Sequence, residues 1–170
     1  NGPVLVTPTA DAESPNIDRI VTEFTTNCAL TSGPNATPSE LGGQPPALTN
    51  DVWFEYRATC TGILTVSGCG TLIGAQNAGG WDQFIAVYHD RNNRATCACP
   101  ASTADNAKLW PAGTGFGESC QGFAVAGPGM ARGGGVRPGD CFMIRNGGFE
   151  GDTGKGVLDI SCENSLCPSG

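Results

Sequence analysis

The stretch DVWFEYRATCTGILTVSGCG, residues 51–70, decides the fold. From Val52 to Ala58 apolar and polar side chains alternate, and this period of two is typical of a half-buried strand. Thr61-Gly62 is typical of a tight turn, and residues 63–67 are rich in the β-branched side chains that suit a pleated surface. An apolar hairpin of this kind is not stable alone in water. We therefore expect it at the centre of a β-sandwich, covered by a second sheet.

The composition indicates one all-β domain. The chain has 170 residues, enough for a sizeable core, with 26 glycines and 12 prolines. No window holds an apolar stripe of helical period for three turns, so helices are not expected. We predict a single antiparallel β-sandwich of the jelly-roll or CUB type over residues 1–170, stapled by disulfides and carrying long Gly/Pro-rich loops. Residues 1–16 are expected to form an extended N-terminal arm and residues 163–170 a short tail.

Further strands follow from the same patterns. Val4-Leu5-Val6 lies between Pro3 and Pro8, which limits it to an edge strand or an arm. The other expected strands are 17–25, 81–88 (the most apolar, expected to be central), 120–126, and a final hairpin of 140–145 with 157–162. Residues 32–46 and 90–118 are expected to be irregular loops, and the segment through Gly135 a Gly-rich connection. The side chains expected in the core are Phe54, Tyr56, Ile85, Val87, Phe142, Ile144, Leu158 and Ile160.

Charge and hydropathy limit the classes of partner that the protein is expected to bind. The formal net charge is −7 and there is no basic cluster, so nucleic acid and anionic membranes are poor partners. No apolar run approaches the ~20 residues that a bilayer-spanning helix needs. The chain begins at Asn1 without a methionine or a signal peptide, as a mature exported product would. We expect a secreted protein, extracellular or at the cell surface.

Cysteine usage favours the same compartment. Nine cysteines occur with one histidine, His89, and without a CxxC pair, so disulfides are favoured over a zinc site. The candidates for disulfides are Cys28, Cys60, Cys69, Cys97, Cys99, Cys120, Cys141 and Cys162. Cys167 is expected to be the odd cysteine, either free or linked to another subunit.

Spacing constrains the pairing. Cys60 and Cys69 flank one strand, and nine extended steps of ~3.3 Å put them about 30 Å apart, beyond the ~7 Å limit for a bridge. Cys141 faces Cys162 if the final hairpin forms. Cys60 is the rival partner of Cys162 if their strands are neighbours.

Catalytic motifs give little support to an enzyme. A Ser-His-Asp triad would need His89, but no G-x-S-x-G elbow occurs, and we expect His89 to be a surface residue at a strand end. The glycine clusters 113–117 and 133–135 lack the Lys-Ser/Thr of a phosphate loop, and turn glycines explain them better. Nothing among the 16 acidic residues singles out a catalytic pair.

Residues typical of binding sites also have structural interpretations. Calcium has two candidate groups, Asp51 with Asp82 and Asp11 with Glu13 and Asp18, although solvated loop acids are the favoured interpretation and no cofactor is expected. Aromatic stacking on a sugar has three candidates, with core packing favoured. They are Trp53, Trp81 and Trp110. The sequence Asn35-Ala36-Thr37 is an acceptor for N-glycosylation, relevant only in an organism that glycosylates exported proteins.

Five segments in order carry a resemblance to a known class. They are residues 51–54, 60–70, 81–88, 137–149 and 156–162. Together they resemble the secreted Gly-rich β-sandwich repeats related to bacterial pre-peptidase C-terminal domains and, more distantly, CUB-type sandwiches. The resemblance implies a non-catalytic module that accompanies extracellular hydrolases or surface proteins as a binding, spacing or assembly domain.

Together these patterns favour a structural function. We expect an extracellular subunit that associates with copies of itself or with a surface matrix, through the edge strand formed by Val4, Leu5 and Val6. This arm either pairs with a neighbouring subunit or lies on the edge of its own domain. The alternative function is an accessory carbohydrate- or protein-binding module of an extracellular hydrolase system.

Overall fold

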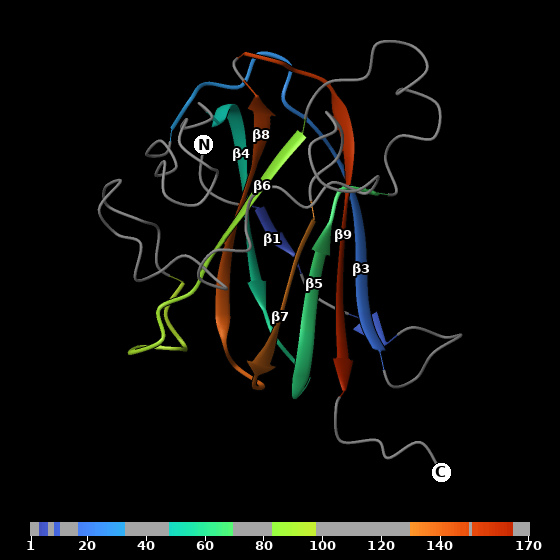
Figure 1. Cartoon of the computed structure of the whole chain (residues 1–170), viewed down its shortest axis with the longest axis vertical. Coiled ribbons are helices and arrows are strands. Elements are labelled where there is room, and N and C mark those ends of the chain that lie inside the picture. Colours follow the sequence, from blue (N-terminus) through green and yellow to red (C-terminus); the bar gives the residue numbers. More distant parts are fainter. Residues whose placement is uncertain are drawn as a thin grey trace.

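Two sheets packed face to face make up the protein (Figure 1). The computed structural model describes residues 4–6, 9–10, 17–32, 48–69, 83–97, 130–149 and 151–164. These residues form nine strands, and neighbouring strands are antiparallel except for one parallel pair at an edge. The predicted all-β, disulfide-stapled sandwich is confirmed. Among the described residues, no helix has the length and hydropathy needed to cross a membrane.

Most consecutive strands lie in different sheets, with β2 and β3 the exception. The first sheet, in spatial order, contains β1 (Val4–Val6), β4 (Leu48–Arg57), β8 (Cys141–Phe149) and β6 (Gln83–Tyr88). The second contains β2 (Thr9–Ala10), β3 (Ile17–Thr25), β9 (Lys155–Asn164), β5 (Gly62–Ser67) and β7 (Met130–Val136). The strand predicted at residues 17–25 is therefore confirmed as β3.

The two predicted hairpins are wrong. β4 lies in the first sheet and β5 in the second, so the segment before Gly62 carries the chain across the sandwich. β8 and β9 are divided between the sheets in the same way. Near the end of β8, a Cβ atom on Gly148 would clash with the carbonyl oxygen of Asp152, so the backbone approaches too closely for any other residue.

The alternation of side chains predicted the core correctly. All eight expected core side chains are at most 2 % exposed: Phe54, Tyr56, Ile85, Val87, Phe142, Ile144, Leu158 and Ile160. They belong to one continuous apolar cluster between the sheets. The partly buried ring of Phe24 packs against this cluster and meets Phe54 edge to face with centroids 5.7 Å apart, which is a favourable aromatic geometry.

Two strands differ from expectation. The strand expected to be central is β6, and it lies at one end of the four described strands of its sheet, although its described side chains are buried. The expected Gly-rich connection is strand β7 instead, which contains Gly133, Gly134 and Gly135. Gly135 has a φ of 79° at a register shift between β5 and β7, so this glycine permits an irregular ladder rather than a turn.

The disulfides decide between the alternatives left open by spacing. Cys60 is bonded to Cys162 and Cys97 to Cys141, so the rival pairing of Cys162 is the one observed. Cys69 is also disulfide-bonded, and the prediction that it does not pair with Cys60 is confirmed. Cys28 was wrongly included among the disulfide candidates. It carries a free, exposed thiol in the turn after β3, where its φ is 64°.

Several predictions lie outside the described residues. They concern the strand 120–126, the loop 33–46, most of the loop 90–118, the sequon at Asn35, the tail 165–170, and the side chains of Cys99, Cys120 and Cys167. Residues 89–97 are described and form no strand, as expected for the start of that loop.

Replacing Phe142 by alanine tests the assignment of the core. Its ring is fully buried, and deleting a packed aromatic side chain typically costs about 3–5 kcal/mol of unfolding free energy. The matched control is Val21→Ala on the exposed face of β3, where a change within about 0.5 kcal/mol is expected. Chemical denaturation measures both, and similar losses at the two positions would show that the strand faces are inverted.

Candidate functional site

The N-terminal segment closes one side of the sandwich. β1 pairs in parallel with β4, with Val4, Leu5 and Val6 opposite Phe54, Glu55 and Tyr56. Further along the chain, β2 pairs with β3, with Thr9 and Ala10 opposite Arg19 and Asp18. The arm, residues 4–10, therefore contributes a strand to the edge of each sheet. The edge strand predicted at Val4-Leu5-Val6 is present, and it has a neighbouring strand that its sequence context did not indicate.

The arm is held by few contacts. β1 has three residues and β2 two, whereas β4 and β3 have ten and nine. Leu5 is 63 % exposed, so its side chain adds little buried area. Three- and two-residue ladders are marginal compared with the long ladders beside them, and they make the arm the most easily separated of the described parts.

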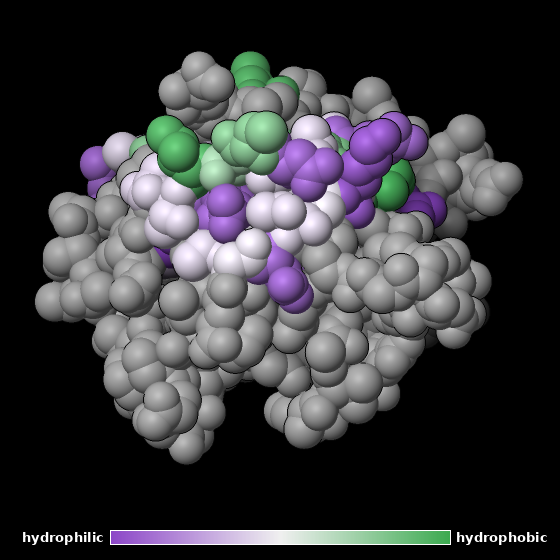
Figure 2. Space-filling model, turned by 90° about the horizontal axis from the view of Figure 1, so that it is seen from above, coloured by the Kyte–Doolittle hydropathy of each residue, from purple (hydrophilic) through white to green (hydrophobic). Residues whose placement is uncertain are grey.

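The segment 26–32, which follows β3, is hydrogen-bonded to β4. The backbone N–H of Asp51 donates to the carbonyl of Leu30, and Asn50 Nδ2 donates to the carbonyl of Ala29. Leu30 is 82 % exposed. Figure 2 looks onto this end of the molecule, where a small apolar area lies beside polar residues.

A buried ion pair lies on the outer face of the first sheet. Arg145 Nη2 is 2.5 Å from Asp51 Oδ2, and the two side chains are 1 % and 0 % exposed. The hydroxyl of Ser32 donates to the Asp51 carboxylate and accepts from the Trp53 indole N–H. The Trp53 ring lies near the Arg145 guanidinium, 5.6 Å from its centroid, and stacks on Tyr88. The network thus joins one negative and one positive side chain, both fully buried, to the hydroxyl of Ser32 and the indole of Trp53.

The contacts in this network bear on the calcium and sugar-binding hypotheses. Asp51 was a calcium candidate, but its carboxylate is committed to Arg145 and Ser32. Trp53 was one of the three sugar-stacking candidates, and its N–H and ring are engaged within the protein, which agrees with the favoured packing role. Asp82, Trp81 and Trp110 lie outside the described residues. Asp18, of the second calcium group, is hydrogen-bonded to the hydroxyl of Thr59, and its partners Asp11 and Glu13 are not described.

His89 is not the surface residue that we expected. It is 2 % exposed because it continues the inward-facing series of Ile85 and Val87. Its ring stacks on Phe142 with centroids 4.5 Å apart, and Nδ1 lies 3.0 Å from the carbonyl oxygen of Cys141. A carbonyl accepts only, so Nδ1 carries the proton. The ring therefore packs in the core.

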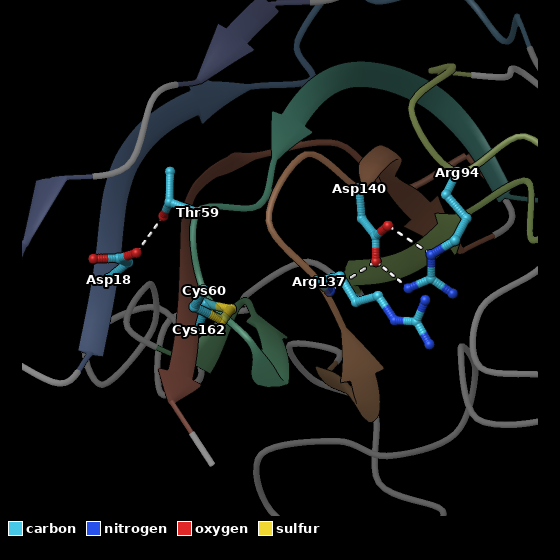
Figure 3. The surroundings of a disulfide bond; sticks show 7 residues. All are labelled: Asp18, Thr59, Cys60, Arg94, Arg137, Asp140 and Cys162. Carbon is cyan, nitrogen blue, oxygen red and sulfur yellow. Dashed lines mark hydrogen bonds and ion pairs between the residues drawn. A yellow bond between two sulfur atoms is a disulfide. The ribbon is translucent and has the colours of Figure 1, made fainter. Parts of the chain in front are cut away.

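Around the Cys60–Cys162 disulfide, polar contacts hold two of the segments in which the chain passes from one sheet to the other (Figure 3). Asp18 and Thr59 connect the start of β3 to the segment that leads from β4 into β5, next to the Cys60–Cys162 bond. Asp140 makes comparable polar contacts in the segment between β7 and β8. Its carboxylate accepts hydrogen bonds from the Arg94 guanidinium and from the backbone N–H of Arg137.

Tyr56 is buried near the same end. Burial raises the pKa of its hydroxyl above the ordinary value, and the negative charge of Asp18 adds to the rise. The hydroxyl therefore stays protonated, and it has no hydrogen-bond partner within the described structure.

One group of side chains has the proximity of metal ligands. Ligand atoms of Glu55, Cys97 and Cys141 lie within 4.8 Å of one another. The two cysteines form a disulfide, and Glu55 is paired with Arg57. In the oxidised protein the sulfurs are therefore not thiolates, the form that binds metals.

The buried ion pair was not predicted, although the sequence contains a signal for it. Arg145 follows the apolar run from Cys141 to Ile144, and a charge in a buried strand requires a buried partner. The positions of Ser32, Arg94 and Asp140 carry no comparable signal, because each depends on contacts between distant segments.

Comparisons with known proteins add no assignment. A scan against protein-family models and searches of curated proteins and solved structures found no match to the chain.

Removing one member of the buried ion pair should be far more damaging than removing one from an exposed pair. Asp51→Ala removes a fully buried counter-charge of the Arg145 guanidinium, and breaking a buried pair in this way typically costs about 3–5 kcal/mol. The control is Asp159→Ala, which breaks the bidentate pair with Arg19, whose side chain is 48 % exposed. Exposed pairs contribute ~1 kcal/mol or less. Equal losses in urea unfolding would mean that the Asp51–Arg145 pair is hydrated in solution.

Proposed function

We propose that the protein is a secreted, non-catalytic structural module that assembles with copies of itself by exchanging its N-terminal arm. The observation that carries the proposal is the arm itself: two very short strands, β1 and β2, that complete both sheets along one side of the sandwich. A subunit that receives the arm of its neighbour retains the same ladders. The contacts within each domain are then equal in the closed and exchanged forms.

The chain length between the arm and the body permits the exchange. Six residues, 11–16, separate β2 from β3. Fully extended, six residues span at most about 20 Å. A neighbour that presents its β3 and β4 edges within this reach can therefore accept the arm without any change in its own strands.

The geometry of the exchange favours a chain of subunits. The donor surface is the arm and the acceptor surface is the edge of β4 and β3, so the two sides of the contact differ. Such heterologous contacts produce rings if the rotation closes and open fibres if it does not. Completion of a sheet by a strand from another chain is a recurring mode of recognition.

Other features support an extracellular setting and a non-catalytic role. Two described disulfides and the bonded Cys69 suit an oxidising compartment. The resemblance to modules related to pre-peptidase C-terminal domains implies a role in binding or assembly. The only histidine is stacked inside the core.

A designed disulfide tests the exchange. Thr9 and Arg19 are opposed in the β2–β3 ladder, so Thr9→Cys with Arg19→Cys should form a bond under mild oxidation. The background is Cys28→Ser, which removes the exposed thiol. If arms are exchanged, assembled protein will give a ladder of covalent multimers on a non-reducing gel. The single variant Thr9→Cys is the control, because one added cysteine can give no more than a covalent dimer.

Two results would contradict the proposal. Monomer bands alone from assembled particles would show that each arm stays on its own domain and would remove strand exchange. Deleting residues 1–9 gives a second measurement: assembly seen by electron microscopy should vanish while the circular dichroism of the monomer is retained. Unchanged assembly after this deletion would exclude any role of the arm.

A further inference from the structure

The two described disulfides differ in exposure and in surroundings. Cys60 and Cys162 are 6 % and 0 % exposed and belong to the apolar cluster between the sheets. Cys141 is also buried, but its partner Cys97 is partly exposed in the segment that follows β6. A thiol that reduces a disulfide needs access to one of its sulfurs. The Cys97–Cys141 bond is therefore the more accessible of the two to a reductant.

A carboxylate lies beside this accessible bond. Cys141 is opposite Arg57 in the β4–β8 ladder, so Glu55, two residues earlier on β4, is on the same face of the sheet. Ligand atoms of Glu55, Cys97 and Cys141 lie within 4.8 Å of one another, and they are the only such group of three among the described residues. Two sulfurs and a carboxylate oxygen are a ligand set for zinc, because thiolates favour zinc over calcium and magnesium.

The carboxylate of Glu55 has one oxygen that Arg57 does not use. Nε and Nη2 of Arg57 both contact Oε1, each at 3.1 Å. Oε2 has no hydrogen bond or ion pair in the described part of the structure. A carboxylate that binds a metal is commonly held by a hydrogen bond of this kind. With two thiolates, the carboxylate, a divalent ion and the guanidinium, the group carries no net charge.

Contacts that do not involve the sulfurs keep the two cysteines together. The backbone N–H of Cys141 donates to the carbonyl of Arg94, and Arg57 Nη1 donates to the carbonyl of Ala95. These bonds attach the segment before Cys97 to the ends of β8 and β4. The cysteines therefore stay close to each other, and to Glu55, when the bond between their sulfurs is opened.

We propose that Cys97, Cys141 and Glu55 form a zinc site in the reduced protein. One thiol of a small dithiol attacks Cys97 Sγ to give a mixed disulfide, and Cys141 leaves as a thiolate. The second thiol displaces Cys97 and closes the dithiol to its own disulfide, so that two electrons pass to the protein. Zinc then binds both sulfurs as their protons are released. Glu55 is the third ligand of the tetrahedral ion, and water is the fourth.

The metal and the disulfide exclude each other at this place in the fold. In an oxidising compartment the disulfide joins the segment after β6 to β8. In reducing surroundings zinc joins the same two segments. The site does not depend on the proposed arm exchange, because all three ligands lie outside the arm.

Protection of the cysteines by zinc tests the site. The full chain is reduced with excess dithiol, freed of it without oxygen, and alkylated at increasing concentrations of Zn²⁺. Peptide mapping should show that zinc slows alkylation of Cys97 and does not affect Cys60. Glu55→Gln keeps the size of the side chain but removes its charge, and it should raise the zinc Kd read at Cys97 at least about tenfold. The matched control is Glu163→Gln on the other sheet, where the carboxylate pairs with Arg132, and it should leave this Kd unchanged.

Three results would overturn the inference. Absence of zinc protection at Cys97 would show that no site forms. Equal protection of Cys60 would show that zinc is bound by an unfolded chain. Both are read from the parent protein, so they do not depend on how a variant folds. A Glu55→Gln variant with the parent's Kd would remove the carboxylate from the site.

Discussion

The fold depends on burying one apolar face from each of two sheets against the other. Phe54, Tyr56, Phe142 and Ile144 face inward from the first sheet, and Leu158 and Ile160 from the second. Neither sheet is stable without the other, because each would leave that face in water. The chain must therefore deliver strands to both layers, and it changes sheet at most of its connections. Thr59 and Cys60 lie in the connection from β4 to β5, and Asp140 lies in the connection from β7 to β8, so their contacts fix two of these crossings.

Local pattern predicted burial much better than it predicted pairing. Alternation in residues 52–58 identified the inward faces correctly, because a period of two is a property of any half-buried strand. It said nothing about which sheet a strand joins. Thr61-Gly62 favours a tight turn in either case, so the sequence did not distinguish a hairpin from a crossing. The error in the Cys141–Cys162 alternative has the same origin: it assumed that β8 and β9 were neighbours.

The polar groups show the same limit. Arg145 lies in an apolar strand and signals a buried partner, yet Asp51, 94 residues away, becomes that partner only through the β4–β8 ladder. His89 was expected at the surface because it follows a strand, but the inward alternation of β6 continues through it. The arm was predicted as a strand from Val4-Leu5-Val6. Its pairing with β4 depends on the tertiary fold, and the proline-bounded sequence contains no trace of it.

The Cys60–Cys162 bond has a mechanical consequence for a subunit under tension. It closes a loop with a sequence separation of 102 residues. When the chain is pulled from both sides of this bond, force passes through the two sulfurs and bypasses everything between them. About 340 Å of contour length is thereby withheld from extension. Strands β1 to β4 precede Cys60 and detach first, whereas β5 to β9 lie within the loop. Each subunit therefore extends by a limited length. It retains most of one sheet as a template for refolding.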